Sequence, residues 1–154
     1  MAFEWLRATS VAAAVRESLL LTAGLSSIHL LGFTLITGGA LVANLRLLGV
    51  LLRDEPLTAV TRPAARAVAV GLLISGITGF LLFAPRATEA SANGTFRLKM
   101  FLLAMAALFQ FTVHRAVSNS ASASQPVLRA VGIAGFLLWT GVAVAGCAYI
   151  LFEG

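Results

Sequence analysis

The sequence has little charge. Only 11% of its 154 residues are Asp, Glu, Lys or Arg, whereas about 25% are charged in soluble domains. Hydrophobic residues make up 59% of the chain, which exceeds the roughly 45–50% of an ordinary soluble domain. So few charged side chains would leave a water-facing surface largely apolar. The composition therefore excludes a typical soluble protein and indicates one that is surrounded by lipid.

Cysteine and catalytic motifs are equally scarce. Cys147 is the only cysteine and lies in an apolar run, which excludes a disulfide framework and a cysteine metal cluster and leaves a packing role. No GxSxG, HExxH, P-loop or GxGxxG motif occurs. The acidic residues all lie in connections or terminal segments. The sequence therefore predicts no catalytic site and no metal site, and it favours a protein that is not an enzyme.

What the sequence does contain is four long apolar stretches. A hydrocarbon core about 30 Å thick is crossed by roughly 20 helical residues. We expect transmembrane helices over residues 18–45, 67–84, 96–115 and 130–152. Four such spans use most of the chain and leave no room for a soluble domain. The predicted fold is all-α, a four-transmembrane-helix bundle that forms a single integral membrane domain over residues 1–154.

The N-terminal segment has a different pattern. Residues 1–16 mix Phe3, Trp5 and Leu6 with charged residues, which suits a short segment at the membrane interface. The charges and the length of the next apolar run differ from those of a cleaved signal peptide, so we expect the first span to be retained. The connection over residues 46–66 is rich in arginine, and Pro63 is well placed near a helix start.

The basic residues bear on location. The net charge is +5, but no run of basic residues typical of nucleic-acid binding is present, and contact with the anionic lipid of a bilayer explains them better. Four spans place both termini on one side. Arg7, Arg16, Arg86, Arg97 and Lys99 fall on that side, and the other side has Arg46, Arg53, Arg62, Arg66, Arg115 and Arg129. This small excess favours both termini outside, in a bacterial inner membrane.

Two kinds of residue in the spans suggest which parts of each span face neighbouring helices and which reach the membrane interface. Gly71, Gly76 and Gly79 lie in the second span, where glycines should face neighbouring helices because they allow close approach. Lys99 lies near one end of the third span and could extend outward to the interface. The many glycines in the spans also make contact with other membrane subunits, or with a second copy of the chain, plausible.

Three motifs resemble those of a known family. They are IHLLG at residues 28–32, NLRLLG at 44–49, and TGFLLF with FRLKM at 78–83 and 96–100. They are similar to motifs of an uncharacterised bacterial family of small four-helix integral membrane proteins, a domain of unknown function similar in style to the copper-resistance D type and to cytochrome b-like membrane proteins. The resemblance covers residues 10–115 and implies a fold rather than a chemistry. Members usually carry an aspartate where this chain has Asn44, so a role for a carboxylate there is not implied.

His29 is the only ionisable side chain expected well inside a span. Ionisable residues in a membrane are costly and usually act as ligands, proton carriers or interhelical hydrogen bonders. On a helical wheel His29 shares its face with small or aliphatic residues, which would permit close helix packing or a flat ligand. Two interpretations stay open: a cofactor ligand, or a neutral histidine bonded to a neighbouring helix.

His114 is the second and last histidine. Histidines on separate spans are typical of a b-type haem held by two imidazoles, so His29 and His114 are both candidate cofactor-binding residues. Helical rise argues against a shared iron, because His29 would lie about 10 Å and His114 about 21 Å below the same surface. The alternative is a helix-end histidine beside Arg115, where positive or polar groups suit the helix dipole.

Three functions remain open at this stage. The leading one is an accessory or binding subunit of a larger membrane assembly, such as a respiratory or photosynthetic one, without catalysis of its own. The second is a b-type haem electron-transfer protein that uses His29, His114 or both. The third is transport of a small cation or proton through His29, for which no acid in a span is present to relay charge. Transport of copper would use soft ligands such as Met100 and Met105. These two residues are five positions apart on a helix and point in different directions, so they form only a weak cluster.

Overall fold

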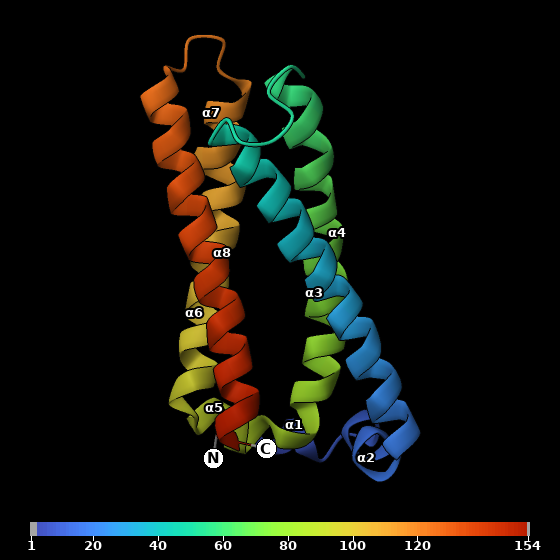
Figure 1. The fold of residues 1–154 in the computed structure, drawn as a ribbon. Helices are drawn as coiled ribbons and strands as arrows, with labels where there is room; N and C mark the ends of the chain where they lie inside the picture. Colours follow the sequence, from blue (N-terminus) through green and yellow to red (C-terminus); the bar gives the residue numbers. More distant parts are fainter. Residues whose placement is uncertain (1–2, 154) are drawn as a thin grey trace.

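The computed structural model describes residues 3–153, which form helices and connections without any strand. Four long helices run side by side (Figure 1) and are α3 (Leu19–Leu47), α4 (Leu57–Phe83), α6 (Gly94–Phe109) and α8 (Gln125–Glu153). The shorter elements are α1 (Glu4–Arg7), α2 (Ser10–Glu17), a 3-10 turn η1 (Ala84–Arg86), α5 (Ala87–Ala92), a π-helical turn η2 (Gln110–His114) and α7 (Arg115–Asn119). The predicted all-α four-helix bundle is confirmed.

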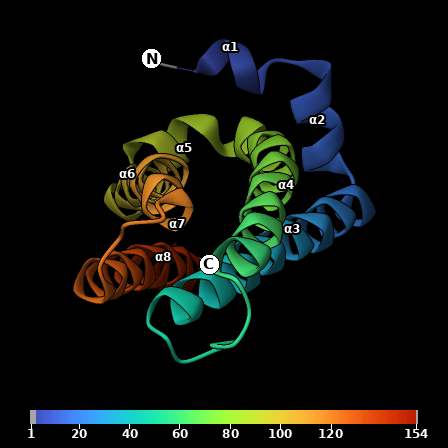
Figure 2. The ribbon, with the colours of Figure 1, turned by 90° about the horizontal axis from the view of Figure 1, so that it is seen from above.

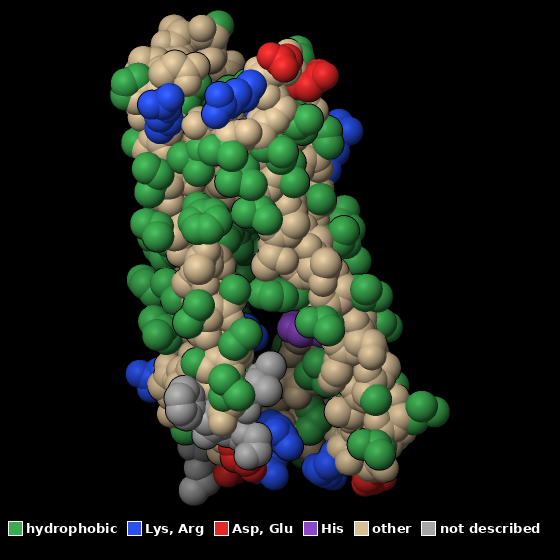
Figure 3. Space-filling model, in the orientation of Figure 1, with side chains coloured by type: hydrophobic (Ala, Val, Ile, Leu, Met, Phe, Trp, Pro, Cys, Tyr) green, Lys and Arg blue, Asp and Glu red, His purple; other side chains and the backbone are tan. Residues whose placement is uncertain are grey.

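The outer faces of the long helices are apolar. Within residues 3–153, four helices are long and apolar enough to cross a membrane. Large apolar side chains on these helices are exposed, including Leu30, Leu73, Phe101 and Leu137, and apolar side chains cover much of the surface in Figure 3. A helix satisfies its own backbone groups and can therefore place such side chains against acyl chains. The chain is thus a membrane protein.

Helix α4 begins earlier than the sequence indicated. The expected span began at residue 67, but the helix begins at Leu57 and contains Pro63 in its interior. Val60, Thr61 and Ala64 on these first turns are buried. Their packing outweighs the local cost of a proline, which removes one backbone hydrogen bond. The other three spans lie where they were predicted, with ends shifted by a few residues.

Helices α3 and α4 pack against each other through glycines. A Cβ atom on Gly71 would lie 2.5 Å from the carbonyl oxygen of Gly32, and one on Gly39 would lie 2.7 Å from the carbonyl oxygen of Ala64. Only glycine allows the two backbones to approach this closely. The expectation that glycines of the second span face other helices is correct for Gly71. It is wrong for Gly76, whose outward side is open.

The bundle consists of two helix pairs, α3–α4 and α6–α8, whose backbones pack closely towards one end and diverge towards the other. We call the end with the α3–α4 and α7–α8 connections the upper end, as it is drawn in Figure 1, and the opposite end the lower end. In the upper half, α8 packs on α3, and Gly132 and Gly135 of α8 lie against Asn44 of α3. The middle of the bundle is filled by Ile36, Ala40, Val68, Ala106, Trp139 and Val142. Towards the lower end the pair α3–α4 separates from the pair α6–α8 (Figures 1 and 2).

Aromatic side chains and the N-terminal segment connect the two pairs at the lower end. Phe83 of α4 stacks on Phe96 of α6 with ring centroids 5.4 Å apart, and Phe96 lies 5.6 Å from Tyr149 of α8. Leu6 and Ala12 of α1 and α2 are buried with Ala84 and Ala87. The N-terminal segment thus lies across the lower end of the bundle, as an interfacial segment would; its residues 1 and 2 lie outside the described part.

The α3–α4 contact makes a direct prediction about stability. We expect Gly71→Ala to lower the free energy of unfolding by about 1–3 kcal/mol, because the added methyl group meets the backbone of Gly32 and overpacks the contact. Gly76→Ala is the matched control on the same helix, since nothing lies within 4 Å of a Cβ there. Thermal unfolding in detergent measures both. Equal unfolding temperatures for the two variants would contradict the proposed contact.

Candidate functional site

Two groups of polar side chains lie inside the bundle at different levels. The lower group consists of His29 on α3, Thr78 on α4 and Lys99 on α6. The upper group consists of Asn44 on α3, Gln110 and His114 on the π-helical turn η2, and Trp139 on α8. Polar groups are expensive in a membrane interior unless they are paired or bind something. We therefore consider each group as a candidate site.

The hydrogen bonds of His29 determine which ring nitrogen carries the proton. The Nδ1 atom of His29 lies 3.1 Å from Oγ1 of Thr78. The single hydroxyl hydrogen of Thr78 is donated to the carbonyl oxygen of Ile74 at 2.7 Å. Oγ1 of Thr78 must therefore accept, and Nδ1 of His29 is the N–H that donates to it. The neutral imidazole consequently has a free lone pair on Nε2.

Helix α4 also makes room for this imidazole. A Cβ atom on Gly79 would lie 3.0 Å from Cε1 of His29, so any larger residue there would displace the ring. Ser75, one turn earlier, donates a hydrogen bond of 3.3 Å to the carbonyl oxygen of His29. Thr78, Gly79 and Ser75 together fix the position of His29. The interpretation as an interhelical hydrogen bonder therefore accounts for Nδ1 but leaves Nε2 without a hydrogen-bond partner among the described residues.

The space beside His29 is a hollow between the two helix pairs. Figure 3 shows this hollow in the lower half of the molecule, with histidine atoms at its edge. Of the two histidines, His29 is half-buried and His114 is 1% exposed. Phe83, one turn beyond Gly79 on α4, belongs with Phe96 and Tyr149 to an aromatic row that bridges the lower ends of α4, α6 and α8.

Lys99 brings a positive charge to the same region, close enough to act on the His29 imidazole. Its Nζ atom lies 4.0 Å from the position of a Cβ on Gly146 of α8. The side chain is half-buried rather than extended outward as the sequence suggested. Among the carboxylate side chains that the structure describes, none forms an ion pair with it. This region therefore offers a lone pair on Nε2 of His29 and, near it, the ammonium group of Lys99.

The upper group is almost completely buried. Asn44, Gln110 and His114 are each 1% exposed. Trp139 donates from Nε1 to Oε1 of Gln110 at 3.3 Å, and Nδ1 of His114 lies 3.3 Å from the hydroxyl of Ser118. Four buried side-chain atoms of this group have no hydrogen-bond partner in the described chain, namely Oδ1 and Nδ2 of Asn44, Nε2 of Gln110 and Nε2 of His114. Gln110 and His114 also lie on a π-helical turn. Such turns are rare in proteins, but those that do occur are often found at functional sites.

The structure does not bring His29 and His114 together. Lys99 lies near His29, and His114 lies fifteen residues beyond Lys99 along the continuous run of α6 and η2, which corresponds to about 22 Å of helix. A single iron cannot bind both imidazoles at that separation. His114 is also not at a helix end, because α7 continues the helix to Asn119. Its side chain is buried inside the bundle.

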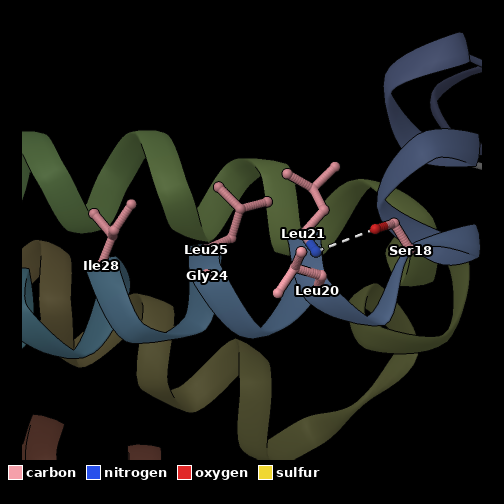
Figure 4. Close-up of a pocket in the computed structure, with 6 residues that line it drawn as sticks. All are labelled: Ser18, Leu20, Leu21, Gly24, Leu25 and Ile28. Atoms are coloured by element: carbon pink, nitrogen blue, oxygen red, sulfur yellow. Dashed lines mark hydrogen bonds between the residues drawn. The ribbon is translucent and has the colours of Figure 1, made fainter.

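Other candidates from the sequence do not converge. Met100, Met105 and Cys147 are exposed, and within the described residues no three His, Cys, Asp or Glu side chains gather to hold a metal ion. A depression on α3 is lined only by residues of that helix and its N-cap, such as Leu20, Gly24 and Ile28 (Figure 4). Its polar member, Ser18, already accepts a hydrogen bond of 3.2 Å from the backbone N–H of Leu21. The rest of the lining is apolar, so the depression suits contact with acyl chains rather than a polar ligand.

Comparison with known proteins yields one match. The model of a family described as a family of unknown function (DUF6644) matches residues 3–153. No curated protein matches the chain, and no solved structure does. The match confirms the uncharacterised family that the motifs suggested. Chemical interpretation therefore depends on the geometry of the two polar groups.

Proposed function

Because the chain belongs to this family of unknown function, we propose its role from the hollow: it is a membrane-embedded binding subunit that holds one ligand between its helix pairs. The proposal rests on the hollow in the lower half of the bundle (Figure 3) and on His29 and Lys99, two polar side chains at this level that lie close enough to influence each other. The ligand that these groups fit has an apolar body, an anionic group that pairs with the ammonium group of Lys99, and a group that bonds to Nε2 of His29.

Contact with other subunits is the second part of the proposal. Gly24, Gly38 and Gly76 have nothing within 4 Å of a Cβ atom. Glycine weakens a helix unless its small size is used in packing, and in membranes it is typical of helix–helix contacts. These outward glycines therefore support docking of helices from another chain. A small bundle that has no catalytic motif would then act within a larger membrane assembly.

Native mass spectrometry in mild detergent tests both parts. We expect the wild-type chain to carry a non-covalent ligand and to copurify with other membrane subunits. Gly79→Leu should lose the ligand but keep the subunits, because a side chain there fills the space of the His29 ring. Gly76→Leu should keep the ligand and lose the subunits. A solitary wild-type chain without bound mass would refute the proposal.

A b-type haem is the specific ligand that one observation favours. Metal-ligating histidines generally donate their other ring N–H to a fixed partner, and His29 donates from Nδ1 to Thr78 in this way. The ammonium group of Lys99 is suited to one of the carboxylates of haem. In this second candidate function His29 alone, rather than His29 with His114, would hold the haem iron from the described chain, and the haem would supply electron transfer.

Absorption spectra after haem supplementation test this candidate. The wild-type chain and His114→Gln should both show a Soret band, and His29→Gln should lack it, since only His29 presents a lone pair to the hollow. Loss of the band in His114→Gln alone would place the haem in the upper half instead. A wild-type chain without a Soret band would rule out haem but leave the more general binding role standing.

The orientation in a bacterial inner membrane is also part of the proposal. The ends of the described chain lie together at the lower end (Figure 1), and the upper end carries the larger number of arginines. The sequence count assigned Lys99 to the lower end, but its side chain is half-buried against α8. This leaves even fewer basic groups exposed at the lower end. By the positive-inside rule the upper end is cytoplasmic and both termini are outside.

Cysteine labelling in intact cells tests this orientation. The background is Cys147→Ser, because Cys147 is exposed and would react itself. In that background Ser122→Cys, in the loop between α7 and α8, should resist a membrane-impermeant maleimide until the cells are lysed. Ala8→Cys, near the lower end, is the matched control and should react in intact cells. The reverse pattern would show that the termini face the cytoplasm.

A further inference from the structure

Asn44 is the most isolated polar side chain in the upper half. It is 1% exposed, and neither Oδ1 nor Nδ2 has a hydrogen-bond partner among the described residues. The nearby Arg46 does not supply one, because its Nη2 atom donates to the carbonyl oxygens of Glu55 and Arg53 at 2.6 and 3.3 Å. A buried amide that lacks a partner destabilises a protein. Asn44 therefore needs a partner that the described chain does not provide.

A groove on the bundle surface leads to this amide. It is formed between α3 and α8 and is lined by Thr37, Leu41, Asn44, Trp139, Thr140 and Ala143. Leu41 and Thr140 are exposed, so the groove opens on the outer face of two membrane-spanning helices. A molecule dissolved in the lipid can thus enter the groove sideways without passing through water. Asn44 belongs to the lining but is 1% exposed, so a small shift of its side chain would bring the amide into contact with that molecule.

The size of the groove limits what it can hold. Its volume is about 180 Å³, close to the roughly 150 Å³ of an apolar cavity that accepts benzene and well below the about 300 Å³ at which pockets for drug-sized molecules begin. The groove therefore accommodates a single six-membered ring, while a longer tail would remain in the surrounding lipid.

The chemistry of the lining restricts the ligand further. No charged side chain lines the groove, so neither a free anion nor a cation would be neutralised there. The amide of Asn44 offers a donor at Nδ2 and an acceptor at Oδ1, which fit the carbonyl oxygen of a quinone and the hydroxyl group of a quinol. An acyl chain would fill the space but would leave the amide unpartnered.

We infer that the groove between α3 and α8 is a binding site for the ring of a lipid-soluble quinone or quinol, with Asn44 as its hydrogen-bond partner. Gly135 makes this possible, because a side chain there would collide with the amide of Asn44. Gln110 has a positioning role, since its Oε1 atom accepts the indole N–H of Trp139 and so fixes one wall of the groove. The site is separate from the hollow of His29, and its test does not depend on a ligand there.

Tryptophan fluorescence tests this inference directly. Quinones quench tryptophan on contact, and the chain has two tryptophans, so Trp5→Phe leaves Trp139 as the only reporter. In phosphatidylcholine vesicles a decyl-tailed benzoquinone should quench Trp139 with a saturating curve. Asn44→Leu should weaken binding about tenfold, which equals about 1.4 kcal/mol and lies at the upper end of the range for one hydrogen bond. Thr34→Val, an exposed position on the same helix, should leave binding unchanged.

Two further measurements keep the test decisive if Asn44→Leu does not fold. Ala143→Leu fills the groove from its outer side without touching the amide, and it should abolish the saturating component. n-Decane, which has the tail but neither a ring nor a polar group, should not displace the quinone from the wild-type protein. Quenching that only rises linearly would overturn the inference, and so would quenching that is unchanged in Ala143→Leu. Displacement by n-decane would also overturn it, by showing a groove for acyl chains.

Discussion

The contact between the backbones of α3 and α4 is the interaction on which the rest of the structure depends. At Gly32, Gly39 and Gly71 the two helices approach too closely for any side chain, so their relative position is fixed by backbone rather than by flexible groups. This contact places Thr78, Gly79 and Ser75 around His29. It therefore determines both where the imidazole lies and which of its nitrogens remains available.

Because α3 and α4 are held together along their length, contacts in the upper half of this pair are enough to position the second pair, α6–α8. The contact with α8 is made in the upper half, at Asn44, Gly132 and Gly135, and the apolar layer around Trp139 closes the middle of the bundle. Below that layer the pairs diverge and the hollow forms (Figure 3). The apolar layer thus separates the hollow of His29 and Lys99 from the buried amides and imidazole of the upper half.

The candidate site was only partly predictable from the sequence. His29 stood out because an ionisable residue in the middle of a span is costly, and the rise of a helix was sufficient to separate it from His114. Thr78 and Asn44 lie within motifs that the sequence does contain, but their roles depend on which neighbouring helix each one meets. The inward position of Lys99 was missed because a lysine near a span end normally extends to the interface.

The sequence by itself determined that the chain crosses a membrane with four helices, because the length and polarity of each segment decide whether it can enter lipid. It also limited the ionisable groups inside the spans to a few residues. Tertiary structure alone decided that the helix pairs pack closely in the upper half and diverge below it, that α4 begins at Leu57 despite Pro63, and that Lys99 lies near His29. Crossing positions and side-chain partners are set by packing between segments far apart in the chain, which periodicity within one segment does not encode.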